Sequence, residues 1–416
     1  MESVLLVIID WNNRDGWFVE DMETELKELV RTSRAEVVDV VACRRDKPTP
    51  KYFIGKGKVQ EIAARCKANN VDVVVFNDDL TSSQQRNLED AFEVKVIDRT
   101  QLILDIFALH AKTQEGKVQV ERAQLEYLLP RLVGKGIVLS RLGGGIGTRG
   151  PGEQKLEVDR RRIHERIANL KTELRQLEKR RESLRRKRTE HFIPTVAIIG
   201  YTNVGKSTLL NALTDSHVVA RDELFSTLDP ITRRFILPDN QKVVFSDTVG
   251  FLHKLPHNLI EAFKATLQEV SNADILLHVL DISHPRIIEH NEAIFEVLKE
   301  LKAENKPIVY ALNKIDKLEN DILITRYQRC FNNAVAVSAL KTQGLDTLIG
   351  RVQSMLNAQI KRIKVFIPHN RMDLVQVFYK EGKIFSKEHN ESGIIIDAQL
   401  PEVIAKKVLT SLKTVC

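Results

Sequence analysis

Eight residues near the middle of the chain have the spacing of a phosphate-binding loop. GYTNVGKS, from Gly200 to Ser207, follows an apolar run and precedes an amphipathic stretch, so it predicts a turn between a buried strand and a helix. Backbone N–H groups of such a turn bind a β-phosphate, while Lys206 neutralises it and Ser207 ligates Mg²⁺. The expected phosphate contacts are Gly200, Tyr201, Thr202, Asn203, Val204, Gly205, Lys206, Ser207 and Thr208.

A second motif, Asn313-Lys314-Ile315-Asp316, indicates which base is bound. The Asp316 carboxylate can accept from both N1–H and the exocyclic amine of guanine, whereas adenine offers neither hydrogen. ATP would leave this acceptor unpaired, at a cost on the order of a few kcal/mol. We expect Asn313 to join this loop to the phosphate loop and Lys314 to lie along the base plane. Backbone support for guanine is expected from Ser338, Ala339 and Leu340.

A third motif, Asp247-Thr248-Val249-Gly250, ends an apolar strand. Asp247 is expected to hold Mg²⁺ through water, and the N–H of Gly250 to bond the γ-phosphate. The next residue is Phe251, where Ras-like enzymes have a glutamine that orients the attacking water. Because phenylalanine has no polar side-chain atom, we predict slow hydrolysis that speeds up when a partner orders the switches. His253 and His257 fit solvent-facing loop positions better than a substitute role.

The composition is that of a globular chain long enough for two to four domains, with 416 residues, 43% hydrophobic and 29% charged. Four widely spaced cysteines predict reduced thiols rather than disulfides or a metal site. The N-terminal apolar run lacks the marks of a signal peptide, and no segment approaches the ~20 apolar residues of a membrane span. We expect a cytoplasmic protein, with peripheral association with a membrane left open.

The predicted fold class is α/β with four parts. Residues 1–98 alternate apolar runs (4–9, 37–42, 71–76, 94–97) with helical stretches near 20–33, 57–69 and 81–92, which predicts a small, largely parallel α/β domain. Residues 192–360 form the predicted P-loop, Ras-like domain. Residues 361–416 read as strand, helix, two strands and helix, a small α+β domain. In the first part, Tyr52 to Lys58 fits a tight strand-to-helix turn better than a phosphate loop.

Residues 99–191 predict a long antiparallel helical hairpin. Helices are expected from Thr100 to Leu132 and from Glu153 to Glu190, and the second has apolar residues at heptad spacing, at 156, 163, 167, 170, 174, 177 and 184. The expected cover for this seam is Leu102, Ile106, Leu125, Leu128 and Leu132.

The loop at the tip of this hairpin, Gly134 to Gly152, has an unusual composition. It contains eight of the chain's 19 glycines, the cations Lys135, Arg141 and Arg149, and no acidic residue. Residues 99–190 hold 22 Lys and Arg against 12 Asp and Glu, a net of +10 in a chain whose formal charge is +7. This concentration of charge favours contact with a polyanion, although a solvated helix face explains charge alone equally well.

The motifs GYTNVGKS, FSTLDP, DTVGF, NKID and SAL, in this order along the chain, resemble those of the HflX family of translational (Obg-HflX type) GTPases. The longer upstream segments, RTQLILDIFALHAKTQEGKVQVERAQLEYLLPRL and SRLGGGIGTRGPGE, resemble it more specifically, and the match begins near YFIGKGKV. The resemblance implies a cytoplasmic GTPase that binds the large ribosomal subunit and dissociates or rescues stalled ribosomes, or acts in ribosome biogenesis. We expect a monomer.

The resemblance also assigns roles to residues. It makes Leu224 to Pro230 the first switch, whose nucleotide contacts would be Phe225, Ser226, Thr227, Leu228 and Asp229. Thr227 would close on Mg²⁺ with Ser207 and Asp247, and the competing candidate is Thr232. Catalysis would rest on Lys206, Thr227 and Gly250. Asn203 resembles the asparagine with which potassium-activated GTPases hold K⁺.

Two other functions remain compatible with these residues. An RNA-remodelling NTPase could use the basic hairpin as a lever, in which case ATP should support activity as well as GTP. A GTP-sensing regulator could instead bind a protein through the heptad seam.

Overall fold

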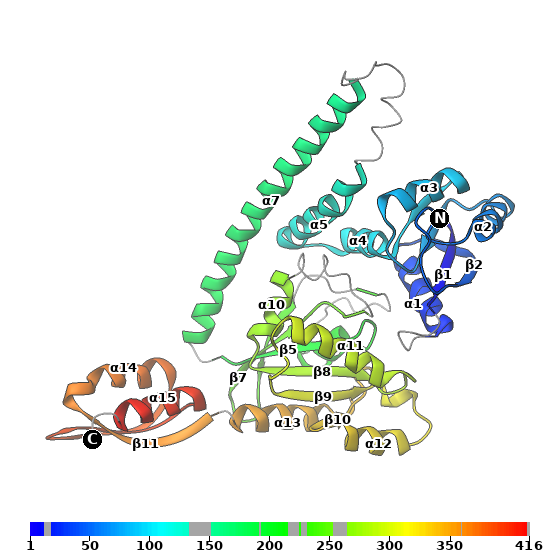
Figure 1. Cartoon of the computed structure of the whole chain (residues 1–416). Coiled ribbons are helices and arrows are strands. Elements are labelled where there is room, and N and C mark those ends of the chain that lie inside the picture. Colours follow the sequence, from blue (N-terminus) through cyan, green and yellow to red (C-terminus); the bar gives the residue numbers. More distant parts are fainter. Residues whose placement is uncertain are drawn as a thin grey trace. The chain divides into compact units, whose positions relative to one another are not determined.

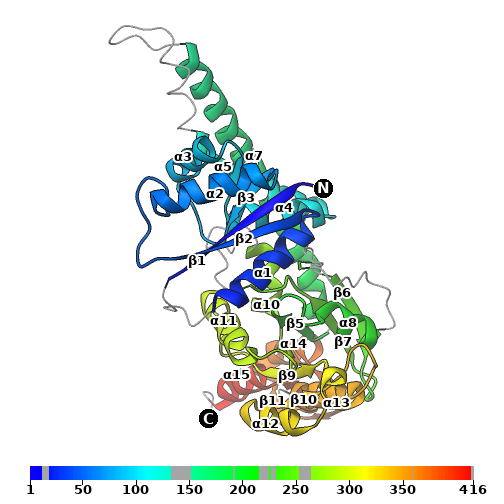
Figure 2. The ribbon, with the colours of Figure 1, turned by 90° about the vertical axis from the view of Figure 1, so that its right-hand side faces the viewer.

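The structure is a computed structural model that describes residues 1–11, 18–132, 151–190, 193–214, 224–225, 231–252, 264–358 and 360–413 (Figures 1 and 2). The chain divides into two compact units. The first contains the described residues up to Leu177 together with Leu224, Phe225 and Lys264, and the second contains the remaining residues from Glu178. No helix among the described residues is both long and apolar enough to cross a membrane.

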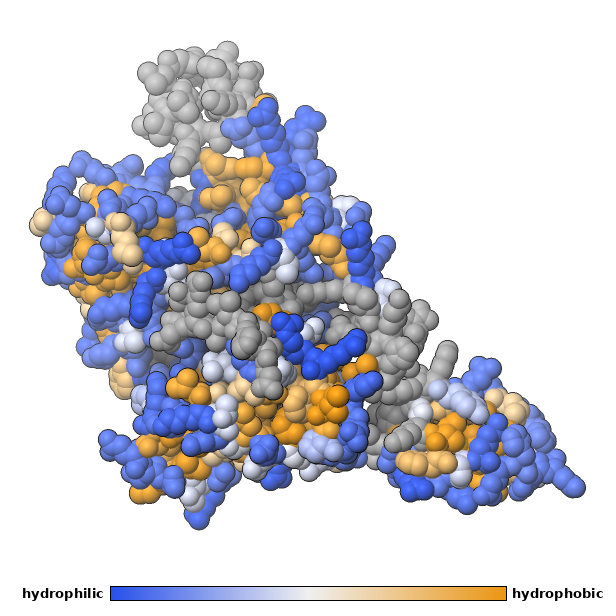
Figure 3. Space-filling model, turned by 180° about the vertical axis from the view of Figure 1, so that it is seen from behind, coloured by the Kyte–Doolittle hydropathy of each residue, from blue (hydrophilic) through white to orange (hydrophobic). Residues whose placement is uncertain are grey.

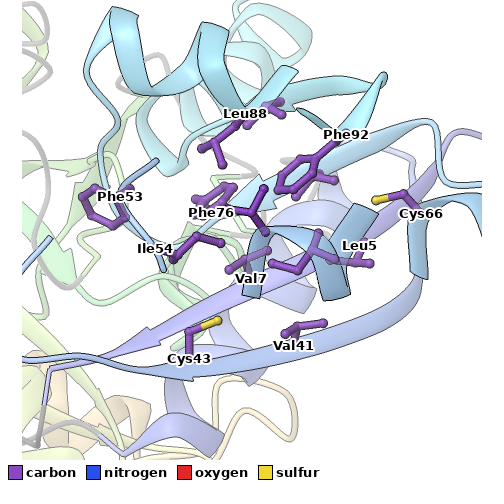
Figure 4. Packing of buried hydrophobic residues seen from close by; sticks show 14 of the residues in the cluster. Leu5, Val7, Val41, Cys43, Phe53, Ile54, Cys66, Phe76, Leu88 and Phe92 are labelled. Atoms are coloured by element: carbon purple, nitrogen blue, oxygen red, sulfur yellow. The ribbon is translucent and has the colours of Figure 1, made fainter. Parts of the chain in front are cut away.

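The first unit is built on a parallel sheet, as predicted. Its strands are β1 (Ser3–Asp10), β2 (Glu36–Arg44), β3 (Val73–Phe76) and β4 (Lys95–Ile97), in the order β2-β1-β3-β4. Helices α1 (Val19–Thr32), α2 (Lys56–Ala68) and α3 (Ser82–Phe92) connect them. Figure 4 shows Leu5 and Val7 of β1 packed with Leu88 and Phe92 of α3 in the apolar core.

The segment from Tyr52 to Lys58 is a tight turn into α2. Thr49 and Phe53 exchange backbone hydrogen bonds, and Phe53 adopts a φ of +66°. A Cβ atom on Gly55 would lie 1.8 Å from Nη2 of Arg45, so the glycine makes room for that side chain. Phe53 and Ile54 are buried in the core, which accounts for the turn without a ligand.

The expected single helix from Thr100 to Leu132 is wrong: the structure has α4 (Arg99–His110) and α5 (Gln114–Leu132). Leu102 and Ile106 are buried on α4, which contacts α1 and β3, and they do not belong to the apolar cluster beside α7. Leu128 is 43% exposed. Of the expected covering residues, only Leu125 packs against that cluster.

Helix α7 (Pro151–Glu190) runs antiparallel to α5, as predicted. Gln114 bonds to Glu173, and Glu121 bonds to Arg166 at 2.7 Å, so residue numbers rise on one helix as they fall on the other. Val118, Leu170 and Leu174 form the buried centre of this contact. The tip loop, residues 134–152, lies outside the described residues except for the two that begin α7.

The second unit contains a six-stranded sheet in the order β10-β9-β8-β5-β7-β6, with only β6 antiparallel to its neighbour. The strands are β5 (Thr195–Gly200), β6 (Ile231–Ile236), β7 (Lys242–Asp247), β8 (Ile275–Asp281), β9 (Ile308–Asn313) and β10 (Ala334–Ala336). The helices are α8 (Lys206–Thr214), α10 (Lys264–Asn272), α11 (Ile287–Glu300), α12 (Ile322–Cys330) and α13 (Leu345–Ala358), with the 3₁₀ turn η1 (Ile315–Lys317). This is the predicted P-loop domain.

The C-terminal part has the predicted order of elements. Strands β11 (Ile360–Pro368), β12 (Lys383–Asn390) and β13 (Gly393–Pro401) form an antiparallel sheet in the order β11-β13-β12. The 3₁₀ turn η2 (His369–Arg371) precedes α14 (Met372–Glu381), and α15 (Glu402–Lys413) follows β13. Side chains of all three strands and both helices pack together in one core.

Candidate nucleotide site

The carboxyl ends of the parallel strands bring the predicted motifs to one edge of the sheet. Strand β5 ends at Gly200, β7 at Asp247, β8 at Asp281 and β9 at Asn313. Ligands of open parallel sheets bind at this edge because the connecting loops converge there. The motifs therefore meet although more than a hundred residues separate the first from the last.

Gly205 gives the phosphate loop its shape. Its φ is +92°, and a Cβ atom there would lie 2.5 Å from Nδ2 of Asn313. Both facts exclude an ordinary side chain at this position. The preceding Asn203 also has a positive φ, of +60°, which asparagine tolerates better than most residues. Helix α8 begins at Lys206, so its first N–H groups face the loop, as a phosphate-binding helix requires.

Lys206 provides the positive charge of the loop. Its ammonium group is buried and donates to the carbonyl oxygen of Tyr201 at 2.8 Å. Burial lowers the pKa of Lys206 to about 8; Asp247 opposes this shift and Lys314 adds to it. A bound phosphate would stabilise the charged ammonium and raise that pKa.

Ser207 and Asp247 fit the predicted magnesium site. The Ser207 hydroxyl donates to Oδ2 of Asp247 at 2.7 Å, and both side chains are buried. A hydroxyl and a carboxylate oxygen are ligands that suit Mg²⁺, which prefers oxygen. Bound Mg²⁺ would neutralise charge that develops on the β- and γ-phosphates.

The segment after β7 lies directly on the phosphate loop. The N–H of Phe251 donates to the carbonyl of Gly200 at 3.1 Å, and the N–H of Thr202 donates to the carbonyl of Phe251 at 2.8 Å. A Cβ atom on Gly250 would lie 2.9 Å from Nζ of Lys206 and 3.0 Å from Cα of Thr202. Gly250 therefore lies close to two residues of the phosphate loop. The Phe251 side chain is 2% exposed and has no polar atom to offer.

Thr248 and Val249, predicted as nucleotide contacts, are both buried. The Thr248 hydroxyl donates to the carbonyl of Ile198 at 2.7 Å, which fixes β7 to the neighbouring strand β5. That hydroxyl is therefore already used within the sheet.

Asn313 connects three loops. Its Nδ2 donates to the carbonyl of Val204 at 2.8 Å, and its Oδ1 accepts from the N–H of Ala339 at 2.9 Å. Lys314 extends the connection, because its Nζ donates to the carbonyl of Asn203 at 2.7 Å. The predicted link between the two nucleotide loops is present in this geometry.

Asp316 is half-buried, and its Oδ1 accepts from the hydroxyl of Ser338. That hydroxyl also accepts from the N–H of Lys341 at 3.1 Å, so the carboxylate is held in one orientation. Ala339 is buried, whereas Leu340 is 76% exposed. The second carboxylate oxygen forms no hydrogen bond within the described residues, so it can accept one from a bound base.

Two contacts of this site were missed from sequence. Asp281 forms an ion pair with Lys314 at 2.8 Å, and although burial alone would raise its pKa, Lys314 and Ser283 hold the pKa of Asp281 below its usual value. The Tyr201 ring stacks on His290 of α11 with centroids 3.9 Å apart. Asp281 could have been noticed as a carboxylate at a strand's carboxyl end; the stacking had no local signal.

Phe225, expected to contact nucleotide, is a buried residue of the first unit. The centroid of its ring lies 4.6 Å from that of Phe107 in an edge-to-face contact. Both rings are buried, because removing large aromatic surfaces from water is favourable. The N–H of neighbouring Leu224 donates to the hydroxyl of Thr32 at 3.3 Å.

Several predicted residues lie outside the described ranges: Ser226, Thr227, Leu228, Asp229, His253 and His257. The rival candidate Thr232 is exposed on β6 opposite Ser246.

Comparison with known proteins places the chain in a family. The family described as "GTP-binding GTPase N-terminal" matches residues 20–108, and "GTP-binding GTPase Middle Region" matches residues 110–188. The family described as "50S ribosome-binding GTPase" matches residues 195–314, and "HflX C-terminal domain" matches residues 323–412. The protein "GTPase HflX" of Lacrimispora saccharolytica is 44% identical over 400 residues, which cover 96% of this chain and 94% of that protein. The chain belongs to the HflX family.

Other relatives of the same name agree. The GTPase HflX of Caldanaerobacter subterraneus subsp. tengcongensis is 46% identical over 92% of this chain and 88% of its own length. That of Escherichia coli is 42% identical over 97% and 94%. Among solved structures, a GTP-binding protein from the archaeon Sulfolobus solfataricus in complex with GDP matches 86% of this chain and 99% of that chain, with a TM-score of 0.45 and 26% identity. As an HflX GTPase, the chain is an enzyme that hydrolyses GTP.

Proposed function

We propose that this HflX GTPase binds the large ribosomal subunit through its helical hairpin, favours that state with GTP bound, and leaves after hydrolysis. Its role would be to dissociate or rescue stalled ribosomes, in the cytoplasm. The match of residues 195–314 to a family described as a 50S ribosome-binding GTPase supports the partner. The four-domain division at 98, 191 and 360 remains part of this proposal.

The observation that carries the proposal is the set of cations on α7. Three of its cations are engaged inside the unit: Arg161 with Glu165, Arg166 with Glu121, and Lys171 with Glu126. Five others are exposed and form no ion pair within the described residues: Arg160, Arg162, Arg175, Lys179 and Arg180. In Figure 3, hydrophilic side chains cover most of the edge that α7 forms. Such a surface gains binding energy by releasing counterions from a nucleic-acid backbone.

The cofactors follow from the site. We expect Mg²⁺ to be held by Ser207 and Asp247, with Thr227 joining when the γ-phosphate is present. We also expect K⁺ near Asn203. GTP hydrolysis should then be faster in potassium than in sodium buffer. Equal rates in the two buffers would refute the proposed potassium site.

The deciding experiment measures GTP hydrolysis with and without purified large subunits, and co-sedimentation with a GTP analogue. Changing both Arg175 and Arg180 to Glu should weaken subunit binding at least about tenfold. The affinity of the variant should also fall less steeply as the salt concentration rises. A matched control changes Arg326 and Arg329, exposed on α12, to Glu. No stimulation by subunits, or equal losses in both variants, would remove the ribosome as partner.

The tip loop offers a second test of the same proposal. Changing Arg141 and Arg149 to Glu should weaken subunit binding and leave GTP affinity unchanged. Activity with ATP equal to that with GTP would instead favour an RNA-remodelling NTPase.

A further inference from the structure

One hydroxyl at the phosphate loop has no assigned role. Thr202 is 5% exposed, and its Oγ1 has no hydrogen-bond partner within the part of the chain that the structure describes. A buried hydroxyl without a partner costs free energy on the order of a kcal/mol or more. In a binding site this cost disappears when the bound ligand supplies the missing hydrogen-bond partner.

The neighbours of Thr202 define which part of the ligand it would meet. Its Cγ2 lies 2.8 Å from the place where a Cβ of Gly250 would stand, and Nζ of Lys206 lies 2.9 Å from the same place. Gly250 is the residue whose N–H is expected to bond the γ-phosphate, and Lys206 is the cation expected to neutralise the adjoining β-phosphate. The Thr202 side chain therefore lies at the γ-phosphate end of the site.

Two other hydroxyls of the site, those of Ser207 and Thr248, are already used. Ser207 donates to Asp247 at 2.7 Å, and Thr248 donates to the carbonyl of Ile198 at 2.7 Å. At the position of the usual water-orienting glutamine stands the buried Phe251. Thr202 is thus a residue in contact with the Gly250 position whose hydroxyl has no hydrogen-bond partner within the described residues.

We propose that Thr202 is a catalytic residue of GTP hydrolysis, whose hydroxyl hydrogen bonds to the attacking water and a γ-phosphate oxygen. In this step the water oxygen bonds to the γ-phosphorus while the bond from phosphorus to the β–γ bridging oxygen breaks. The electron pair of that bond stays on the β-phosphate of GDP, and the water proton passes to the released phosphate. Thr202 orients the water and neither gains nor loses a proton. Enzymes accelerate phosphoryl transfer mainly by positioning the reactants and stabilising the charge of the transition state. One well-placed hydrogen bond to the attacking water can therefore change the rate of hydrolysis.

The proposal rests on GTP hydrolysis by this chain and not on the ribosomal partner, so it is tested without ribosomes. The full-length protein is compared with Thr202→Val, which keeps the shape and removes the hydroxyl, and with Thr202→Ser, which keeps the hydroxyl. Single-turnover hydrolysis of GTP with Mg²⁺ gives the chemical rate, and titration with a fluorescent GDP gives affinity for a nucleotide that lacks the γ-phosphate.

Thr202→Val should slow hydrolysis at least about tenfold, in line with removal of one preorganised hydrogen-bonding group, while its GDP affinity stays within about twofold. Thr202→Ser should hydrolyse within about threefold of the natural protein. Hydrolysis by Thr202→Val at the natural rate would overturn the proposal. So would a Ser variant as slow as the Val variant, or a loss of GDP affinity as large as the loss of rate.

Discussion

Replacing Asp316 with Asn should abolish tight binding of guanine nucleotides. Oδ1 of Asp316 accepts from Ser338, so the amide oxygen of the variant would keep that bond and turn its NH₂ toward the base. The base then meets a donor where it had an acceptor. The loss of a hydrogen bond to a charged group, about 1.5–3 kcal/mol, adds to the cost of an unsatisfied buried donor, about 1–3 kcal/mol. A total of roughly 2.5–6 kcal/mol corresponds to about a 10²- to 10⁴-fold weaker binding of GDP.

Calorimetric titration with GDP, ADP and xanthosine diphosphate measures this directly. Xanthine carries a carbonyl in place of the exocyclic amine of guanine, so it should bind the Asn variant better than GDP does. Asp321→Asn, the same chemical change at an exposed aspartate just before α12, serves as the control and should leave GDP affinity unchanged. GDP affinity within about threefold of the natural value in Asp316→Asn, or ADP bound as tightly as GDP by the natural protein, would refute base selection by this carboxylate.

Three further outcomes follow from the geometry. Gly250→Ala would place a methyl 3.0 Å from Cα of Thr202, a backbone atom that cannot yield, so single-turnover GTP hydrolysis should slow at least about tenfold with little change in GDP affinity. Because the pKa of Lys206 is lowered to about 8, its charge is lost as pH rises; calorimetry should find GDP binding about fourfold weaker near pH 8.5 than near pH 7. Phe107→Ala removes a buried ring that contacts Phe225, so denaturant unfolding of the first unit should lose about 3–5 kcal/mol and proteolysis around Phe225 should become faster.

The sequence allowed the nucleotide site to be predicted because its parts are local patterns at the ends of apolar strands. Lys206, Asp247 and Asn313 each follow directly on such a strand or its turn, and parallel topology then brings them together. The parallel sheet of the first unit was predictable for the same reason. In both cases the signal lies within a few residues of the feature.

The features that the sequence did not show depend on distant neighbours or on a helix cap. Thr113 marks the break between α4 and α5. Its hydroxyl accepts a hydrogen bond from the N–H of Gly116, which caps the N-terminus of α5. Heptad spacing shows that α7 has an apolar seam, but not that Leu102 and Ile106 of α4 are buried outside the cluster beside α7. The burial of Phe225 against Phe107 joins residues far apart in sequence, and no periodicity indicates it.

Asn313 has a consequence for how the enzyme can vary. Its two amide atoms hold the turn that receives phosphate and the loop that supports the base, so neither can relax without the other. A variant that enlarged base choice by moving the loop at Ala339 would shift Val204 as well. A change that alters base selectivity by moving this loop is therefore expected to alter phosphate binding as well.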